Sequence, residues 1–115
     1  MTIELVDLEE LGEAALQEFQ DGVANSRENP DFVFSKIVDR LIGKVEFAYG
    51  LAAKLAHREP TVEGTAAIWS KMVSICDDIA RQVLQLETDY PAGKASYDRI
   101  LDFRNAAEKR RELHS

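Results

Sequence analysis

Apolar residues recur along the chain at alternating steps of three and four, and no stretch alternates strictly between apolar and polar positions. Steps of three and four keep side chains on one face of a helix, whereas a strand repeats with a period of two. The pattern therefore predicts an all-α fold. A chain of 115 residues is long enough for one continuous core, so we expect residues 1–115 to form a single helical-bundle domain.

Two long apolar seams lie on either side of Pro60, which forbids a continuous helix. The connection between them is so short that the two helices, 30–58 and 62–88, must be antiparallel neighbours, with Thr61 capping the second. The seams are Phe34, Val38, Leu41, Val45, Ala48, Ala52 and Leu55, and then Val62, Thr65, Trp69, Met72, Cys76, Ile79, Val83 and Leu86.

Shorter apolar stripes predict a helix before this hairpin, 8–24, and one after it, 97–113. Asp7, in a capping box, and Ser96 are the expected N-caps of these helices, and Asn29, followed by a proline, is the expected N-cap of the second helix. The expected fold is an antiparallel up-down four-helix bundle built on the long hairpin.

The closed tip of the hairpin is a candidate interaction surface. At 1.5 Å per residue, its arms are about 43 and 40 Å long and the outer helices about 26 Å each, so the tip should protrude. Leu51, Leu55, Val62 and Trp69 would then be partly uncovered, which favours a homodimer through the tip. The alternative is that residues 3–6 extend the first helix and cover much of this surface.

Small residues in the hairpin indicate where helices come close together. Ala48, Ala52 and Ala56 form a ridge that lets the two arms approach closely. Gly43 and Gly50 share one face, where each costs helix stability, so we interpret them as a close packing contact, with a functional hinge as the alternative.

The negative charge of the chain is concentrated near its start. Seven acids precede the first base, and the remaining 14 equal the 14 Lys and Arg residues, so this segment carries the whole net charge of −7. Nucleic acid is therefore a disfavoured partner. The basic run 109–111 is expected to stabilise a helix end and to lie near the acidic first helix. The alternative is that Glu9, Glu10 and Glu13 face a basic partner protein.

Location is predicted from the single cysteine and from two absent signals. Cys76 has no intramolecular partner, which suits a reducing compartment. No leader pattern and no long apolar run is visible, so no membrane association is expected and the cytoplasm is the predicted location.

Residues with potential chemistry do not form a recognised catalytic or metal-binding pattern. His57 and His114 are far apart and lack the spacing of metal ligands, so neither a metal nor a cofactor is expected. Cys76 lies on an apolar seam, where a thiol is a poor nucleophile. Asp77 and Asp78 are expected to be solvated.

Arg104 lies at the border of the last apolar face and needs a carboxylate partner, for which Glu13, Glu18 and Asp77 are candidates. The leading functional hypothesis is a non-enzymatic helical interaction protein, such as an adaptor, a small regulator or a chaperone-like partner, that associates with itself or another protein. The alternative is a small-molecule-binding or hydrolytic bundle with Tyr49, Trp69 and Arg104 lining a pocket.

Overall fold

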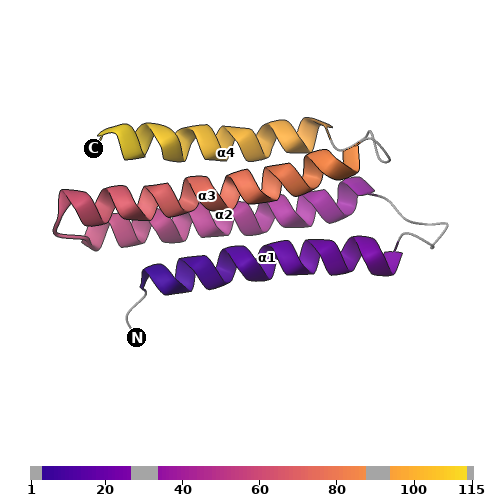
Figure 1. The fold of residues 1–115 in the computed structure, drawn as a ribbon, viewed down its shortest axis with the longest axis horizontal. Coiled ribbons are helices and arrows are strands. Elements are labelled where there is room, and N and C mark those ends of the chain that lie inside the picture. The colour runs from indigo at the N-terminus through magenta and orange to yellow at the C-terminus, as the bar shows by residue number, and fades with distance from the viewer. Residues whose placement is uncertain (1–3, 27–33, 88–93, 114–115) are drawn as a thin grey trace.

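The computed structural model describes residues 4–26, 34–87 and 94–113. These residues form four helices, α1 (Leu5–Ser26), α2 (Phe34–Arg58), α3 (Val62–Glu87) and α4 (Lys94–Leu113). The helices alternate in direction along the chain, with α2 and α3 forming the central hairpin (Figure 1). The predicted antiparallel up-down four-helix bundle is confirmed.

The two outer helices lie on opposite sides of the hairpin (Figure 1). Both α1 and α4 contact α2 and α3, but the described parts of α1 and α4 do not contact each other. The bundle is consequently flattened, with extents of 51 × 28 × 16 Å. The prediction that the acidic first helix lies near the basic end of the last one is wrong.

The buried surface of α3 explains this arrangement. Ile68 and Ile75 are buried on one side of its seam, and Ile75 lies against Gly12 of α1. Val73 and Ala80 are buried on the other side, where Asp77 bonds to α4. An apolar face this wide lets α1 pack on one side of α3 and α4 on the other, so α1 and α4 need not contact each other.

The outer helices are longer than the sequence predicts, because two of the assigned caps are wrong. Helix α1 begins at Leu5 rather than after Asp7, and the Asp7 carboxylate accepts a hydrogen bond of 2.7 Å from the backbone N–H of Glu4. Asp7 is thus the third residue of the helix, and Glu4, to whose backbone N–H it bonds, is the cap residue. Helix α4 begins at Lys94, before Ser96, and the expected cap at Asn29 lies outside the described residues.

Thr61 caps α3 as predicted. Its Oγ1 accepts a hydrogen bond of 2.9 Å from the backbone N–H of Gly64 and donates one of 2.9 Å to the carboxylate of Glu59. This pairing satisfies one of the free amides of the first turn.

Candidate functional site

The residues at the tip of the hairpin are more buried than the sequence predicts. Leu55 and Trp69 are only 8% and 1% exposed, so the expectation that they are uncovered is wrong. Leu51 is half-buried, and only Val62 is well exposed, at 58%. The reason is that α1 and α4, with 22 and 20 residues, run alongside most of the hairpin, although the tip itself extends beyond the start of α1 (Figure 1).

An aromatic cluster joins three helices next to the tip. The Tyr49 ring of α2 lies 5.3 Å from the Trp69 ring of α3 and 5.7 Å from the Phe103 ring of α4, centroid to centroid. Arg110 Nε donates a hydrogen bond of 3.0 Å to Tyr49 Oη, and its guanidinium carbon lies 5.3 Å from the Trp69 centroid. Arg110 is therefore held in one orientation by a phenol and an indole.

The three residues of the predicted pocket do not come together. Tyr49 and Trp69 are in contact, but Arg104 lies elsewhere, and Arg110 contacts the aromatic rings in its place. The sequence contained a signal for this role, because Arg110 follows Phe103 by seven residues and Ala107 by three and so shares their helix face. Because residues 109–111 were interpreted as a basic run that stabilises the helix end, the position of Arg110 on this face was overlooked.

Arg104 pairs with Asp77, one of its three predicted partners. Its Nε donates a hydrogen bond of 3.0 Å to Asp77 Oδ1 and so links α4 to α3. Glu108 lies next along this edge and pairs with Arg111. The Asp77 side chain is 43% exposed, so it is partly solvated as expected but also paired. Asp78 is exposed and, among the described residues, pairs with Arg81 of its own helix.

Cys76 is unsuited to nucleophilic chemistry. Its side chain is 0% exposed, and burial, together with the adjacent Asp77 charge, raises its pKa to about 12, while Arg104 acts in the opposite direction. A thiol with so high a pKa stays protonated near neutral pH. Within the described ranges, no group of three His, Cys, Asp or Glu side chains could hold a metal ion. None of the helices there is both long and apolar enough to cross a bilayer.

The acidic residues of α1 differ in their pairing. Glu9 forms an ion pair of 2.5 Å with Lys71 of α3, so it is tied into the fold. Glu10 and Glu13 are exposed and form no ion pair with any described residue. Of the predicted partner-binding acids, these two are the ones free to meet another molecule.

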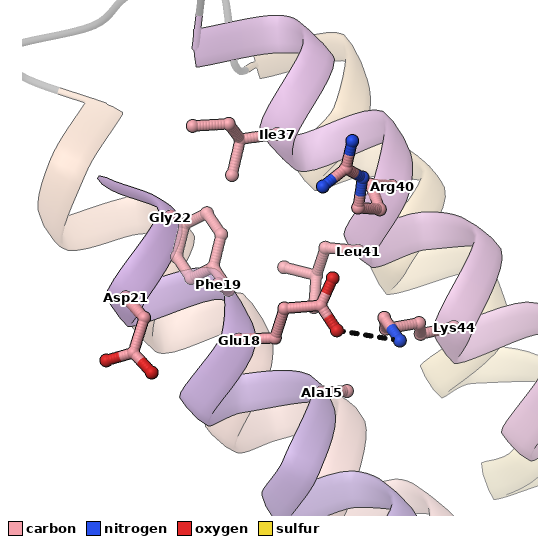
Figure 2. Close-up of a pocket in the computed structure, with 9 residues that line it drawn as sticks. All are labelled: Ala15, Glu18, Phe19, Asp21, Gly22, Ile37, Arg40, Leu41 and Lys44. Atoms are coloured by element: carbon pink, nitrogen blue, oxygen red, sulfur yellow. Dashed lines mark ion pairs between the residues drawn. The ribbon is translucent and has the colours of Figure 1, made fainter. Parts of the chain in front are cut away.

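A shallow groove of about 190 Å³ runs between α1 and α2 (Figure 2). Its floor is apolar, with Phe19 and Ile37 among the residues that line it, and the ion pair of 2.8 Å between Glu18 and Lys44 crosses it. Arg40 lies on the α2 side. The groove therefore leads from the acidic surface of α1 to the outer face of α2.

The outer face of α2 has an exposed stripe that the sequence reasoning missed. Its members follow one another at steps of four and three, all are exposed, and Phe47 at the centre is 65% exposed. None of its four bases forms an ion pair within the described part of the chain. We call the following residues the α2 stripe: Lys36, Arg40, Gly43, Phe47, Gly50, Lys54 and Arg58.

The two glycines of the α2 stripe make no close packing contact. A Cβ atom added at Gly43 or Gly50 would meet nothing within 4 Å, so the predicted close contact between helices is wrong. Gly12 of α1 does make a close contact of this kind, because it lies under Ile75 of α3. Gly43 and Gly50 instead leave the α2 backbone open on both sides of Phe47.

A hollow of about 450 Å³ opens at the tip between α2, α3 and the end of α4. Trp69 and Arg110 line it, and Tyr49 and Arg104 do not.

Comparison of the chain with protein-family models, curated proteins and solved structures gave no match.

Proposed function

We propose that this chain is a non-enzymatic helical interaction module that self-associates through the α2 stripe. The observation that supports the proposal is a set of four bases that form no ion pair with the described residues and lie symmetrically around an exposed aromatic side chain. Lys36 and Arg40 lie 11 and 7 residues before Phe47, and Lys54 and Arg58 lie 7 and 11 residues after it.

The stability of the monomer does not explain the α2 stripe. Lys36 with Arg40, and Lys54 with Arg58, are like-charge pairs four residues apart, each of which destabilises a helix by about 0.2–0.5 kcal/mol. Each glycine costs up to about 1 kcal/mol relative to alanine. An exposed phenylalanine contributes nothing to the core. These costs are understandable if the face is covered by a partner.

The spacing of the α2 stripe suits a helical partner. Positions at alternating steps of four and three form the seam along which two helices pack at about +20°. Gly43 and Gly50, one on each side of Phe47, leave room for bulky side chains of the partner to rest on the α2 backbone. A partner helix with acidic flanks would neutralise the four bases.

The acidic helix α1 of a second copy meets this description. The segment that includes α1 carries the whole net charge of −7, and its exposed Glu10 and Glu13 are unpaired among the described residues. Helices α1 and α2 are antiparallel neighbours (Figure 1). A two-fold axis between them would place α1 of each copy on α2 of the other, which gives a closed dimer rather than a filament.

The alternative of two α2 stripes packed together is less favourable. That contact would bring the four bases of each copy together, and like charges across an interface cost affinity. Phosphate backbones are also poor candidates, because a nucleic acid on the α2 stripe would pass the acidic surface of α1 in the same molecule. The predicted exclusion of nucleic acid is retained as part of the proposal.

Sedimentation equilibrium at several protein concentrations tests the proposal. We expect a monomer–dimer equilibrium at low ionic strength that shifts toward monomer as salt is added, since the contact depends on exposed charges. Phe47→Ser should abolish the dimer. Leu84→Ser is the matched control, because Leu84 is 48% exposed on α3 and outside the α2 stripe.

Charge-reversed variants test the pairing of α1 with α2. A variant with Lys36→Glu and Lys54→Glu, and another with Glu10→Lys and Glu13→Lys, should each be monomeric. Mixing the two should produce a heterodimer in which one contact has the native charges and the other pairs the two reversed sets of charges. A wild-type chain that stays monomeric at all concentrations and salts would refute self-association, as would a Phe47→Ser variant that dimerises like the wild type.

A further inference from the structure

The hollow at the hairpin tip has the size of a small-molecule site. Its volume of about 450 Å³ falls within the roughly 300–1,000 Å³ of typical ligand sites. It lies at the end of the bundle, and none of the α2 stripe residues lines it. Three helices and the connection between α2 and α3 contribute the residues around it, which are Ala53, Ala56, His57, Glu59, Pro60, Thr61, Val62, Thr65, Trp69 and Arg110.

Arg110 supplies an oriented positive charge at this hollow. Its Nε donates a hydrogen bond to Tyr49 Oη, and the guanidinium group lies over the Trp69 ring. Its two terminal nitrogens make no hydrogen bond to the described residues. The terminal N–H groups of a guanidinium form a planar fork that matches the two oxygens of a carboxylate. Because the other contacts already hold the side chain, little side-chain entropy is lost when a ligand binds.

The remaining polar groups favour a singly charged anion. Glu59 is the one acid among the described residues of the lining, and its Oε1 already accepts hydrogen bonds from the backbone N–H and the hydroxyl of Thr61. The Thr65 hydroxyl donates to the Thr61 carbonyl at 2.9 Å and can still accept a hydrogen bond. A doubly charged phosphate would have one guanidinium to neutralise it and a carboxylate nearby, so a carboxylate fits better.

Part of the lining of the hollow is apolar and lies among the polar groups. Trp69 lies at its inner side with 1% of its surface exposed, and no described residue accepts a hydrogen bond from its indole N–H. Ala53, Ala56 and Val62 line the rest, and small alanine side chains leave room for a bulky group. The lining therefore combines a carboxylate-binding group with a small apolar surface among other polar groups.

We propose that the hairpin tip binds a small carboxylate with an apolar body. The carboxylate pairs with the terminal nitrogens of Arg110, and the body lies against Val62 and the two alanines beside Trp69. This site shares no residue with the α2 stripe, although Lys54 and Arg58 of the stripe are next to Ala53 and His57 in the sequence.

Binding can be followed at the site itself, because Trp69 is the single tryptophan of the chain. We expect benzoate and hexanoate to change its fluorescence saturably, and benzamide and hexanamide, which lack the charge, to have a much weaker effect. Equilibrium dialysis with radiolabelled benzoate gives the affinity independently of any direct effect on the fluorophore. No saturable binding of either carboxylate up to about 10 mM, or equal binding of the amides, would overturn the proposal.

Variants separate the role of Arg110 from its structural contacts. Arg110→Gln should weaken carboxylate binding about ten-fold or more, while Arg81→Gln, at an exposed arginine on α3, should leave it unchanged. Ala56→Leu keeps the guanidinium but fills the hollow, so it should also abolish binding. Circular dichroism checks that each variant is folded. Unchanged benzoate affinity in both Arg110→Gln and Ala56→Leu would exclude this site.

Discussion

Gly12 is the position where the addition of one methyl group tests the packing of α1 on α3 most directly. A Cβ atom there would lie 2.8, 2.9 and 3.0 Å from Cγ1, Cδ1 and Cγ2 of Ile75. All three atoms belong to one β-branched side chain that is 8% exposed and stiff about χ1, so no single rotation moves them all away.

The expected free energies follow from these contacts. Overpacking of a core costs about 1–3 kcal/mol, while replacement of a helical glycine by alanine gains up to about 1 kcal/mol, so Gly12→Ala should lose about 0–3 kcal/mol of stability. Gly43→Ala and Gly50→Ala, where nothing lies within 4 Å, should each gain up to about 1 kcal/mol.

Urea denaturation followed by circular dichroism measures these differences. It should be done at one protein concentration and in high salt, because self-association would add a concentration-dependent term to the stability. The Ile75→Ala background supplies the decisive control. There the added methyl group has room, so Gly12→Ala should become stabilising, and the double-mutant cycle should show a coupling of about 0.5–3 kcal/mol. If Gly12→Ala stabilises the wild type as much as Gly43→Ala does, the packing argument is wrong.

Three further predictions concern the buried thiol, the helix cap and the alanine ridge. The pKa of Cys76 is raised from 9.0 to about 12, so between these values the unfolded chain loses a proton that the folded chain keeps, and stability should fall with rising pH by up to about 1.4 kcal/mol per unit. The Cys76→Ala variant should lack this slope in denaturation between pH 9 and 12, and equal slopes would contradict the assignment. Thr61→Ala removes the acceptor for the Gly64 amide and should cost about 1 kcal/mol in urea denaturation, whereas Thr61→Ser should be close to neutral; equal losses would show that the hydroxyl is not the cap. Ala52→Leu, at a position 0% exposed, should destabilise the fold by about 1–3 kcal/mol in the same assay, while the exposed Ala24→Leu should change little, and similar values for the two would exclude close packing of the hairpin arms.

The sequence by itself determined the helices and their order. The steps of three and four along the seams specify which residues of each helix share a buried face, and Pro60 and Thr61 specify where the hairpin turns. The buried positions Ile100 and Ala107 of α4 were also predictable, as was Asp77 among the partners of Arg104. Each of these features depends on contacts within one helix or across one short connection, which local periodicity encodes.

Only the tertiary structure decided which helix lies against which face. Periodicity places Arg104 and Arg110 on or near the apolar face of α4, but only the packed neighbours show that one meets a carboxylate and the other an aromatic cluster.

The same holds for the glycines, since Gly12 is covered by Ile75 whereas Gly43 and Gly50 face open space. The seam of a helix is visible in its sequence, but the side chain that lies opposite belongs to another helix. The placement of α1 and α4 on opposite sides of the hairpin follows from the width of two buried faces taken together, and no single segment carries that information.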